Sequence, residues 1–271
     1  MKIAFIGGGN MAQALIGGLL RNGIAASSIR VVEVEPERLA TLRQKFSIDG
    51  SSKADETLRG TDATVFAVKP QQMREACQQC RPFLDSGFVL TIAAGIPAAA
   101  VAAWSGRPQV VRAMPNTPAL VGAGITGISA PADLAPNARE LAERIMGSVG
   151  EVVWFEDESM LDAVTAVSGS GPAYVFFFIE ALQAAAEAMG MKPDQARRLS
   201  LATFFGAAQL ARESGEPVQV LRERVTSKGG TTAAALEKMR GNRLHENFVD
   251  AVFAALERSR ELARSFGDAE A

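Results

Sequence analysis

The opening residues hold the pattern best suited to chemistry, a glycine-rich turn between two regular elements. Residues 2–6 resemble a short buried strand, Gly7-Gly8-Gly9-Asn10-Met11-Ala12 follows at once, and an apolar helix runs from Ala12 to Leu20. In this G-x-G-x-x-A pattern Gly7 permits a tight turn, Gly9 leaves room for a pyrophosphate, and Ala12 lets helix and strand approach closely. The helix start adds free N–H groups and the positive end of a dipole. The sequence therefore predicts a dinucleotide site, with an ordinary glycine-rich turn as the alternative.

Acidic residues stand at the end of the next predicted strand, Ile29–Val34. Glu33 follows the glycines at about the 20-residue spacing of an acid that binds the adenosine ribose, and Glu35 is a rival for this role. The alternative is a solvated charge at the strand end. We find no arginine beside either acid to receive a 2′-phosphate, so we expect NADH to be accepted well.

Two polar stretches follow later strands, at the edge where ligands of doubly wound sheets collect. Lys69, within Val68-Lys69-Pro70, is placed to touch phosphate or substrate, unless it is a surface lysine with only backbone near the ligand. Residues 112–118 contain two prolines that stiffen a loop, in which Asn116 and Thr117 offer hydrogen bonds. Asn116 is thus a candidate cofactor contact, and a rigid turn is the alternative.

The second half of the chain has two glycine-rich stretches, at residues 168–172 and 227–232. Each ends where a helix is predicted to begin, at Pro172 or Thr231. Successive backbone N–H groups, hydroxyls and a helix N-terminus make a good pocket for a carboxylate. The second stretch has more glycines and hydroxyls than a plain helix connection needs, and its Thr232 hydroxyl is a candidate donor to the substrate.

The elements that position these residues change character along the chain. Up to about residue 155, predicted strands alternate with helices, which indicates an α/β fold with a mostly parallel, doubly wound sheet. Beyond Asp157 the pattern contains helices alone. We therefore predict a dinucleotide-binding domain over residues 1–160 and a helical, substrate-binding domain over residues 161–271.

The predicted helix Pro172–Met189 is apolar on most sides and includes Phe176-Phe177-Phe178-Ile179. Such a helix should be buried all round. The remaining helices of the short second half offer little cover, so a homodimer joined through this half, or a higher oligomer of such dimers, is expected. The alternative is a monomer with this helix in its own core.

Composition excludes several classes of protein. The formal net charge of −2 over 271 residues argues against nucleic acid or an anionic membrane as partner. No segment has the roughly 20 apolar residues of a membrane span, and two cysteines without a signal peptide fit the cytoplasm. These are Cys77 and Cys80, which the helical pattern makes ordinary helix residues rather than a redox pair. No Cys/His cluster suggests a metal.

Five motifs together resemble those of the pyrroline-5-carboxylate reductase family, from the last step of proline biosynthesis. They are residues 5–12, 67–71, 112–118, 168–174 and, most specifically, Val225-Thr226-Ser227-Lys228-Gly229-Gly230-Thr231-Thr232. The resemblance implies a Rossmann domain followed by an all-helical dimerisation domain, with NADPH or NADH as cofactor and an active site between domains and across the dimer. Two features depart from the family pattern: Lys228 stands where many members have proline, and Glu33-Val34-Glu35 puts the choice of cofactor in doubt.

The resemblance also implies roles for individual residues. Val68, Lys69 and Pro70 line the nicotinamide side, and the substrate carboxylate is held by Ser227, Gly230, Thr231 and Thr232, with Thr232 and Ser227 as the candidate catalytic residues. The other expected cofactor contacts are Gly7, Gly9, Asn10, Met11 and Ala12 of the first motif, Glu33 at the end of the second strand, and Asn116 in the motif of residues 112–118.

The small number of possible proton donors in the sequence agrees with the reduction of an imine. Ketone reduction creates an alkoxide and needs a placed acid, but the only histidine and tyrosine, His245 and Tyr174, are better explained as structural. A protonated cyclic imine loses charge when it accepts hydride, so binding, orientation and a dry pocket suffice. Two alternative functions remain open. A β-hydroxyacid dehydrogenase would need a lysine where the chain has Val175, and a non-catalytic NAD(P)-binding sensor would need no carboxylate pocket.

Overall fold

The computed structural model describes residues 1–267, which form two compact units. The first unit contains Met1–Ser170 together with the chain from Ala255 onward, and the second contains Gly171–Ala254. The last four residues of the predicted helical domain lie outside the described part.

In the first unit eight strands form one sheet, in the order β3-β2-β1-β4-β5-β6-β7-β8. All neighbours are parallel except β6 and β7, so the sheet is mostly parallel, as predicted. The six strands from β3 to β6 have the order of a Rossmann fold. The strand bounds are β1 Ile3–Ile6, β2 Ile29–Val32, β3 Asp49–Ser51, β4 Ala63–Phe66, β5 Phe88–Thr91, β6 Val110–Met114, β7 Gly124–Ser129 and β8 Gly150–Trp154.

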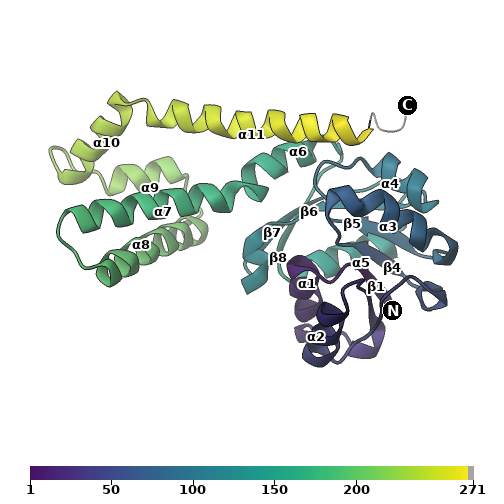
Figure 1. The fold of residues 1–271 in the computed structure, drawn as a ribbon. Helices are drawn as coiled ribbons and strands as arrows, with labels where there is room; N and C mark the ends of the chain where they lie inside the picture. Colours follow the sequence, from purple (N-terminus) through teal and green to yellow (C-terminus); the bar gives the residue numbers. More distant parts are fainter. Residues whose placement is uncertain (268–271) are drawn as a thin grey trace. The chain divides into compact units, whose positions relative to one another are not determined.

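Helices cover both faces of this sheet (Figure 1). Because side chains alternate along a strand, Ile3 and Phe5 of β1 enter one apolar cluster while Ala4 and Ile6 enter the other. The first cluster is covered by α1 (Asn10–Arg21), α2 (Pro36–Phe46) and α5 (Pro136–Gly147), and the second by α3 (Met73–Cys80) and α4 (Ala98–Ser105). A strand buried on both faces explains the continuous apolar runs seen in the sequence.

The structure differs from the sequence pattern at three places. The edge strand β3 was not predicted, because Asp49-Gly50-Ser51 has no apolar alternation. The strand predicted to reach Val34 ends at Val32, and the Val34 side chain is exposed. The helical pattern around Cys77 and Cys80, which extends over residues 71–84 in the sequence, forms the shorter helix α3 flanked by single 3-10 turns, Pro70–Gln72 and Arg81–Phe83. The second turn contains a proline, which has no N–H to donate.

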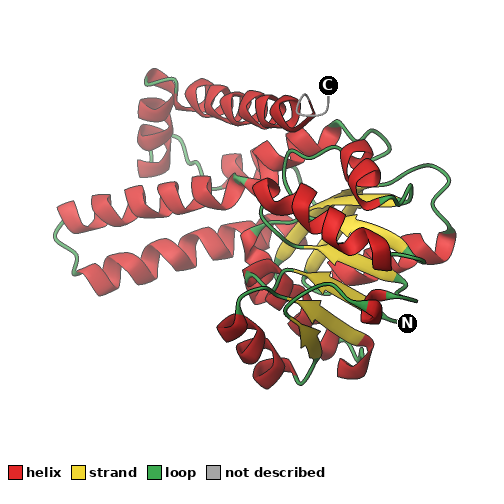
Figure 2. Cartoon of the chain, turned by 45° about the vertical axis from the view of Figure 1, so that its right-hand side comes forward, coloured by secondary structure: helices red, strands yellow, loops and turns green. Residues whose placement is uncertain are grey.

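The second unit is helical, and no strand occurs between Phe155 and Gly267, as the sequence predicted. Figure 2 shows α7 and α8 as neighbouring helices joined by a short turn that contains Gly190. The bounds are α7 Gly171–Ala188, α8 Pro193–Ser214, α9 Val218–Arg224, α10 Thr231–Gly241 and, shared with the first unit, α11 Leu244–Gly267.

Helix α7 is not buried within one chain, as expected if its cover comes from a second copy, and the alternative of a monomer with this helix in its own core was wrong. Ala186 alone among its residues is buried, and Phe176 and Phe177 are 64% and 65% exposed. The neighbouring Phe178 does have cover, since its ring lies edge-on to Phe248 of α11 at 5.5 Å. Large exposed aromatic side chains indicate a surface that associates with another protein.

The last part of α11 belongs to the sheet unit. Ser259 Oγ donates to Asp162 Oδ1 at 2.7 Å, on the short helix α6 (Met160–Val164). Phe266 packs against the cluster under α3 and α4, and Leu262 lies beside Gly95. The second unit therefore begins at Gly171 and ends before Ala255, so the first unit is built from both ends of the chain. Within the described helices none is long and apolar enough to cross a membrane.

Candidate active site

The glycine-rich turn has the geometry that a dinucleotide needs. Gly7 has φ of +92°, and a Cβ there would lie 2.9 Å from the Ala67 carbonyl oxygen. Gly9 caps α1 without a side-chain hydrogen bond, and a Cβ there would meet nothing within 4 Å. The open space over Gly9 and the free N–H groups of the first helical turn make a cradle for phosphate.

A cavity of about 510 Å³ opens over this turn at the carboxyl edge of the sheet. Gly7, Gly9, Asn10, Glu33, Val68 and Lys69 line it together, so the structure unites six of the predicted cofactor contacts. The other described lining includes Gly8, Val34, Glu35, Arg38, Lys53 and Gln72. Because the turn leaves room for phosphate and the cavity continues to the end of β2, these residues fit an NAD(P)H molecule.

Three predicted contacts of the same region are not among the described lining residues. Ala12 is fully buried in the apolar cluster, where it performs the close helix packing expected of its position, and Met11 packs against that cluster. Pro70 begins the 3-10 turn that follows Lys69. Their contribution to cofactor binding stays a prediction.

The carboxylate of Glu33 is 3% exposed and heavily engaged. Its Oε2 accepts from the Gly8 N–H at 2.8 Å, and its Oε1 accepts from the Glu35 N–H at 2.9 Å. Arg38 Nη1 lies 3.3 Å from Oε2 of Glu33, and Arg38 Nη2 lies 2.7 Å from Oε2 of Glu35. The expectation that no arginine stands beside these acids was therefore wrong, because α2 begins at Pro36 and brings Arg38 back over the strand end.

Asn116 occupies a different place from the cavity. Its side chain is largely buried, and Oδ1 accepts from the Ile125 N–H of β7 at 3.0 Å. This bond ties the loop after β6 to the antiparallel strand that follows. A contact from Asn116 to the cofactor stays a prediction.

The first glycine-rich stretch of the second half is helical, not the loop we expected. Thr165–Gly169 forms a π-helix between α6 and α7, a feature often found at functional sites. Ser168 Oγ donates to the Val164 carbonyl at 3.0 Å, and a Cβ at Gly169 would lie 2.6 Å from Met114 Cε. The glycine thus lets this turn pack against the end of β6.

A partly buried ion pair holds the same corner of the sheet. Arg112 Nη1 lies 2.6 Å from Glu158 Oε1, and the same oxygen accepts from the Ala98 N–H at 2.8 Å. Arg112 is the less exposed partner, and the Ala98 N–H belongs to the first turn of α4. Glu158 therefore caps α4 and anchors the chain just before α6, a role that the sequence motif did not show.

The second glycine-rich stretch forms the start of α10 in the helical unit. Gly229 has φ of +72°, Gly230 is the N-cap, and the Gly230 N–H donates to the Ser227 carbonyl at 3.0 Å. A Cβ at Gly230 would lie 2.5 Å from Ser227 Oγ. The structure thus gathers Ser227, Gly230, Thr231 and Thr232 at a helix N-terminus, whose first N–H groups have no partner within the helix.

The two cysteines, which were predicted to be ordinary helix residues, are buried. Cys77 and Cys80 are free thiols in the core of the first unit, and burial raises the pKa of each to about 12. A thiol that remains protonated is a poor nucleophile.

Among residues 1–267 no group of His, Cys, Asp and Glu has the arrangement of a metal site.

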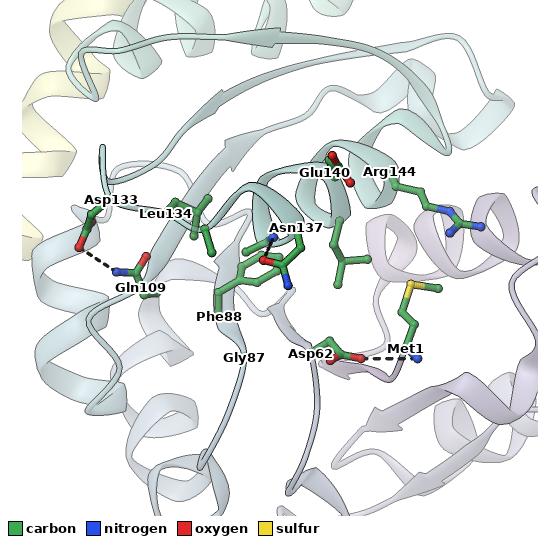
Figure 3. Close-up of a pocket in the computed structure, with 13 residues that line it drawn as sticks. Met1, Asp62, Gly87, Phe88, Gln109, Asp133, Leu134, Asn137, Glu140 and Arg144 are labelled. Atoms are coloured by element: carbon green, nitrogen blue, oxygen red, sulfur yellow. Dashed lines mark hydrogen bonds and ion pairs between the residues drawn. The ribbon is translucent and has the colours of Figure 1, made fainter.

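A larger cavity, of about 780 Å³, lies at the opposite edge of the sheet, where β1, β4, β5 and β6 begin (Figure 3). Its lining carries charges of both signs: Asp62 Oδ2 lies 3.7 Å from the terminal ammonium, and Asp133 accepts a hydrogen bond from Gln109 Nε2 at 3.2 Å. Figure 3 shows Glu140 and Arg144 of α5 on another part of its lining. Ligands of such sheets bind at the carboxyl edge, so the site is placed at the smaller cavity.

Comparison with known proteins decides the family. The chain is 44% identical to pyrroline-5-carboxylate reductase of Pseudomonas aeruginosa, over 98% of both chains. It is 40% identical to the Haemophilus influenzae enzyme, over 97% of this chain and 98% of that one. This chain belongs to the pyrroline-5-carboxylate reductase family.

Family models and solved structures agree with this assignment. Residues 158–262 match the pyrroline-5-carboxylate reductase dimerisation model, and residues 2–95 match the model of coenzyme F420-dependent NADP oxidoreductases. The fold superimposes on a pyrroline-5-carboxylate reductase from Coxiella burnetii with a TM-score of 0.91 and 38% identity, covering 97% of this chain and 98% of the other. For the Plasmodium falciparum pyrroline carboxylate reductase with NADP bound, the TM-score is 0.86 and the identity 28%, at the same coverage. The predicted resemblance and fold class are confirmed.

Proposed function

We propose that this chain reduces 1-pyrroline-5-carboxylate to L-proline with NADPH or NADH, in the cytoplasm, as the last step of proline biosynthesis. The observation that carries the proposal is the start of α10, where Ser227, Gly230, Thr231 and Thr232 form an uncapped helix N-terminus in a chain that also has a dinucleotide cavity. A five-membered imine acid has one permanent anion, and such a helix start is suited to hold it.

Each part of the chain has a defined task in this reaction. The turn at Gly7–Gly9 and the first N–H groups of α1 hold the pyrophosphate, and Val68 and Lys69 line the way to the nicotinamide. A bound nicotinamide supplies the hydride. Thr231 and Thr232 hold the substrate carboxylate through N–H groups and the Thr232 hydroxyl, which orients the ring. Because the protonated imine becomes a neutral amine, the residues need not stabilise a developing oxyanion.

The reaction is tested by following the absorbance of reduced nicotinamide with purified protein. We expect oxidation of NADPH or NADH that requires 1-pyrroline-5-carboxylate and yields proline. Two outcomes would contradict the proposal. One is turnover of a β-hydroxyacid with NAD(P)+ but not of the imine. The other is tight cofactor binding without turnover, as in a redox sensor.

We further propose that the active protein is a homodimer, or a ring of such dimers, joined through the helical unit. The match of residues 158–262 to a dimerisation model and the exposed Phe176 and Phe177 of α7 support this assembly. Burying such rings stabilises association by roughly 25 cal/mol for each Å² removed from water.

Light scattering at micromolar concentration is expected to show a dimer or a multiple of two protomers. Phe176→Asp should shift the protein toward monomers, whereas Glu180→Asp, at an exposed acidic position on the same helix, should not. A wild-type monomer at this concentration would rule the assembly out.

A further inference from the structure

At the end of β2, an acidic and a basic side chain lie next to each other, in the place where either type can contact the adenosine ribose of a dinucleotide. In dinucleotide sites of this fold an acid at this position binds the ribose diol of NAD, whereas a nearby arginine accommodates the 2′-phosphate of NADP. Here Glu33 and Arg38 both line the cavity that holds the dinucleotide in the proposed function, together with Glu35 and Lys53. The two cofactors differ only at this ribose, so the contacts among these side chains determine the choice.

Glu33 is fixed by the backbone. Its oxygens accept from the N–H groups of Gly8 and Glu35, and the side chain is almost fully buried. A carboxylate held by two such donors does not move easily. Glu33 is therefore a constant feature of the site for either cofactor.

Arg38 and Glu35 are the side chains at this strand end that can move. Glu35 is the N-cap residue of α2, and Arg38 lies three positions later, with 2.7 Å between Nη2 and Oε2. The Glu35 side chain is 61% exposed and Arg38 is half-exposed. An exposed pair of this kind is held weakly, so a stronger anion can displace the Glu35 carboxylate from the guanidinium.

We propose that Arg38 is the 2′-phosphate ligand of this chain and that Glu35 is a positioning residue that restrains it. While Arg38 is paired with Glu35, it offsets one of the two carboxylate charges at the strand end, and the ribose diol of NADH is the favoured ligand. To bind, a 2′-phosphate has to displace Glu35 from Arg38 and approach the carboxylates of Glu33 and Glu35, and Lys53 is a further cation that lines the same cavity. Removing the Glu35 charge leaves Arg38 with Glu33 as its remaining carboxylate contact and releases its Nη2, which should shift the preference toward NADPH.

The test uses fragments without nicotinamide, so it does not depend on the proposed reaction. Calorimetry measures the dissociation constants of adenosine 2′,5′-bisphosphate and of ADP for the full-length protein and its variants. Since a hydrogen bond to a charged group can change affinity by about tenfold or more, Glu35→Gln is expected to tighten the bisphosphate roughly three- to tenfold. Arg38→Gln should weaken the bisphosphate by about tenfold, and neither variant should change ADP affinity comparably.

Glu37→Gln is the matched control, since Glu37 is an exposed acid of the same helical turn and is not part of the described cavity lining. It removes the same charge but should leave the ratio of the two dissociation constants as in the wild type. In the double variant, Glu35→Gln with Arg38→Gln, the tighter binding of the bisphosphate caused by Glu35→Gln should disappear. This result would show that Glu35 acts through Arg38. The proposal is overturned if Glu35→Gln and Glu37→Gln alter the ratio equally, or if Arg38→Gln leaves bisphosphate affinity unchanged.

Discussion

Replacing Thr232 by valine should lower kcat/KM for 1-pyrroline-5-carboxylate by about one to two orders of magnitude, since a hydrogen bond to a charged group contributes roughly 1.5–3 kcal/mol. Valine keeps the shape of threonine and loses the hydroxyl. Thr232 is the second residue of α10, next to N–H groups that the helix leaves unpaired. Steady-state kinetics with varied imine at saturating cofactor measures the effect.

Thr226, six residues before Thr232, provides a control of the same chemistry. Its hydroxyl donates to the Arg222 carbonyl at 2.6 Å and is thereby committed within the chain. Thr226→Val should keep kcat/KM within about threefold, as expected for the loss of one ordinary hydrogen bond near the surface. Equal losses in both variants, or a Thr232→Val loss seen in dinucleotide affinity, would refute the assignment of the carboxylate to α10.

Gly9→Ala is expected to weaken dinucleotide binding by about one to two orders of magnitude, because the methyl group takes the space of charge-assisted hydrogen bonds to the pyrophosphate. The free protein should tolerate the change, since a Cβ at Gly9 meets nothing within 4 Å and the residue has an ordinary φ of −66°. Fluorescence titration with reduced cofactor and thermal unfolding without it measure the two effects separately.

Gly7→Ala provides the contrast. With φ of +92° and a Cβ only 2.9 Å from a backbone oxygen, alanine there is strained in the free protein. The cost should be about 1–3 kcal/mol of unfolding free energy. If Gly9→Ala destabilises the free protein as much as Gly7→Ala does, the cradle over Gly9 is not open space and the phosphate site is misplaced.

The sequence predicted the backbone of this site well because its signals are local. A strand, three glycines and a helix in direct succession leave few alternatives, and residues 2–20 fold accordingly. Glu33 also lies on the predicted cavity. Its two backbone donors could not be predicted, because Gly8 is 25 residues away in the chain and the register between β1 and β2 decides that contact.

The missed features depend on geometry that spacing alone does not show. Arg38 was overlooked because it stands three residues beyond Glu35 rather than beside it, although Pro36 as a helix start would have placed it on the same side. The π-helix at Thr165–Gly169 has no sequence signature apart from its glycine. The exposure of Phe176, by contrast, agrees with the expectation that the second half of one chain offers α7 little cover.

The return of α11 to the sheet unit has a consequence for the order in which a newly made chain can fold. The last strand ends at Trp154, but the segment that supplies Ser259, Leu262 and Phe266 to the same unit begins only at Ala255. At a synthesis rate of about 5–20 residues per second, these parts leave the ribosome roughly 5–20 s apart. During that interval Asp162 lacks its Ser259 partner and the cluster under α3 and α4 lacks Phe266. The first unit to be synthesised is therefore completed only after the whole second unit has been made.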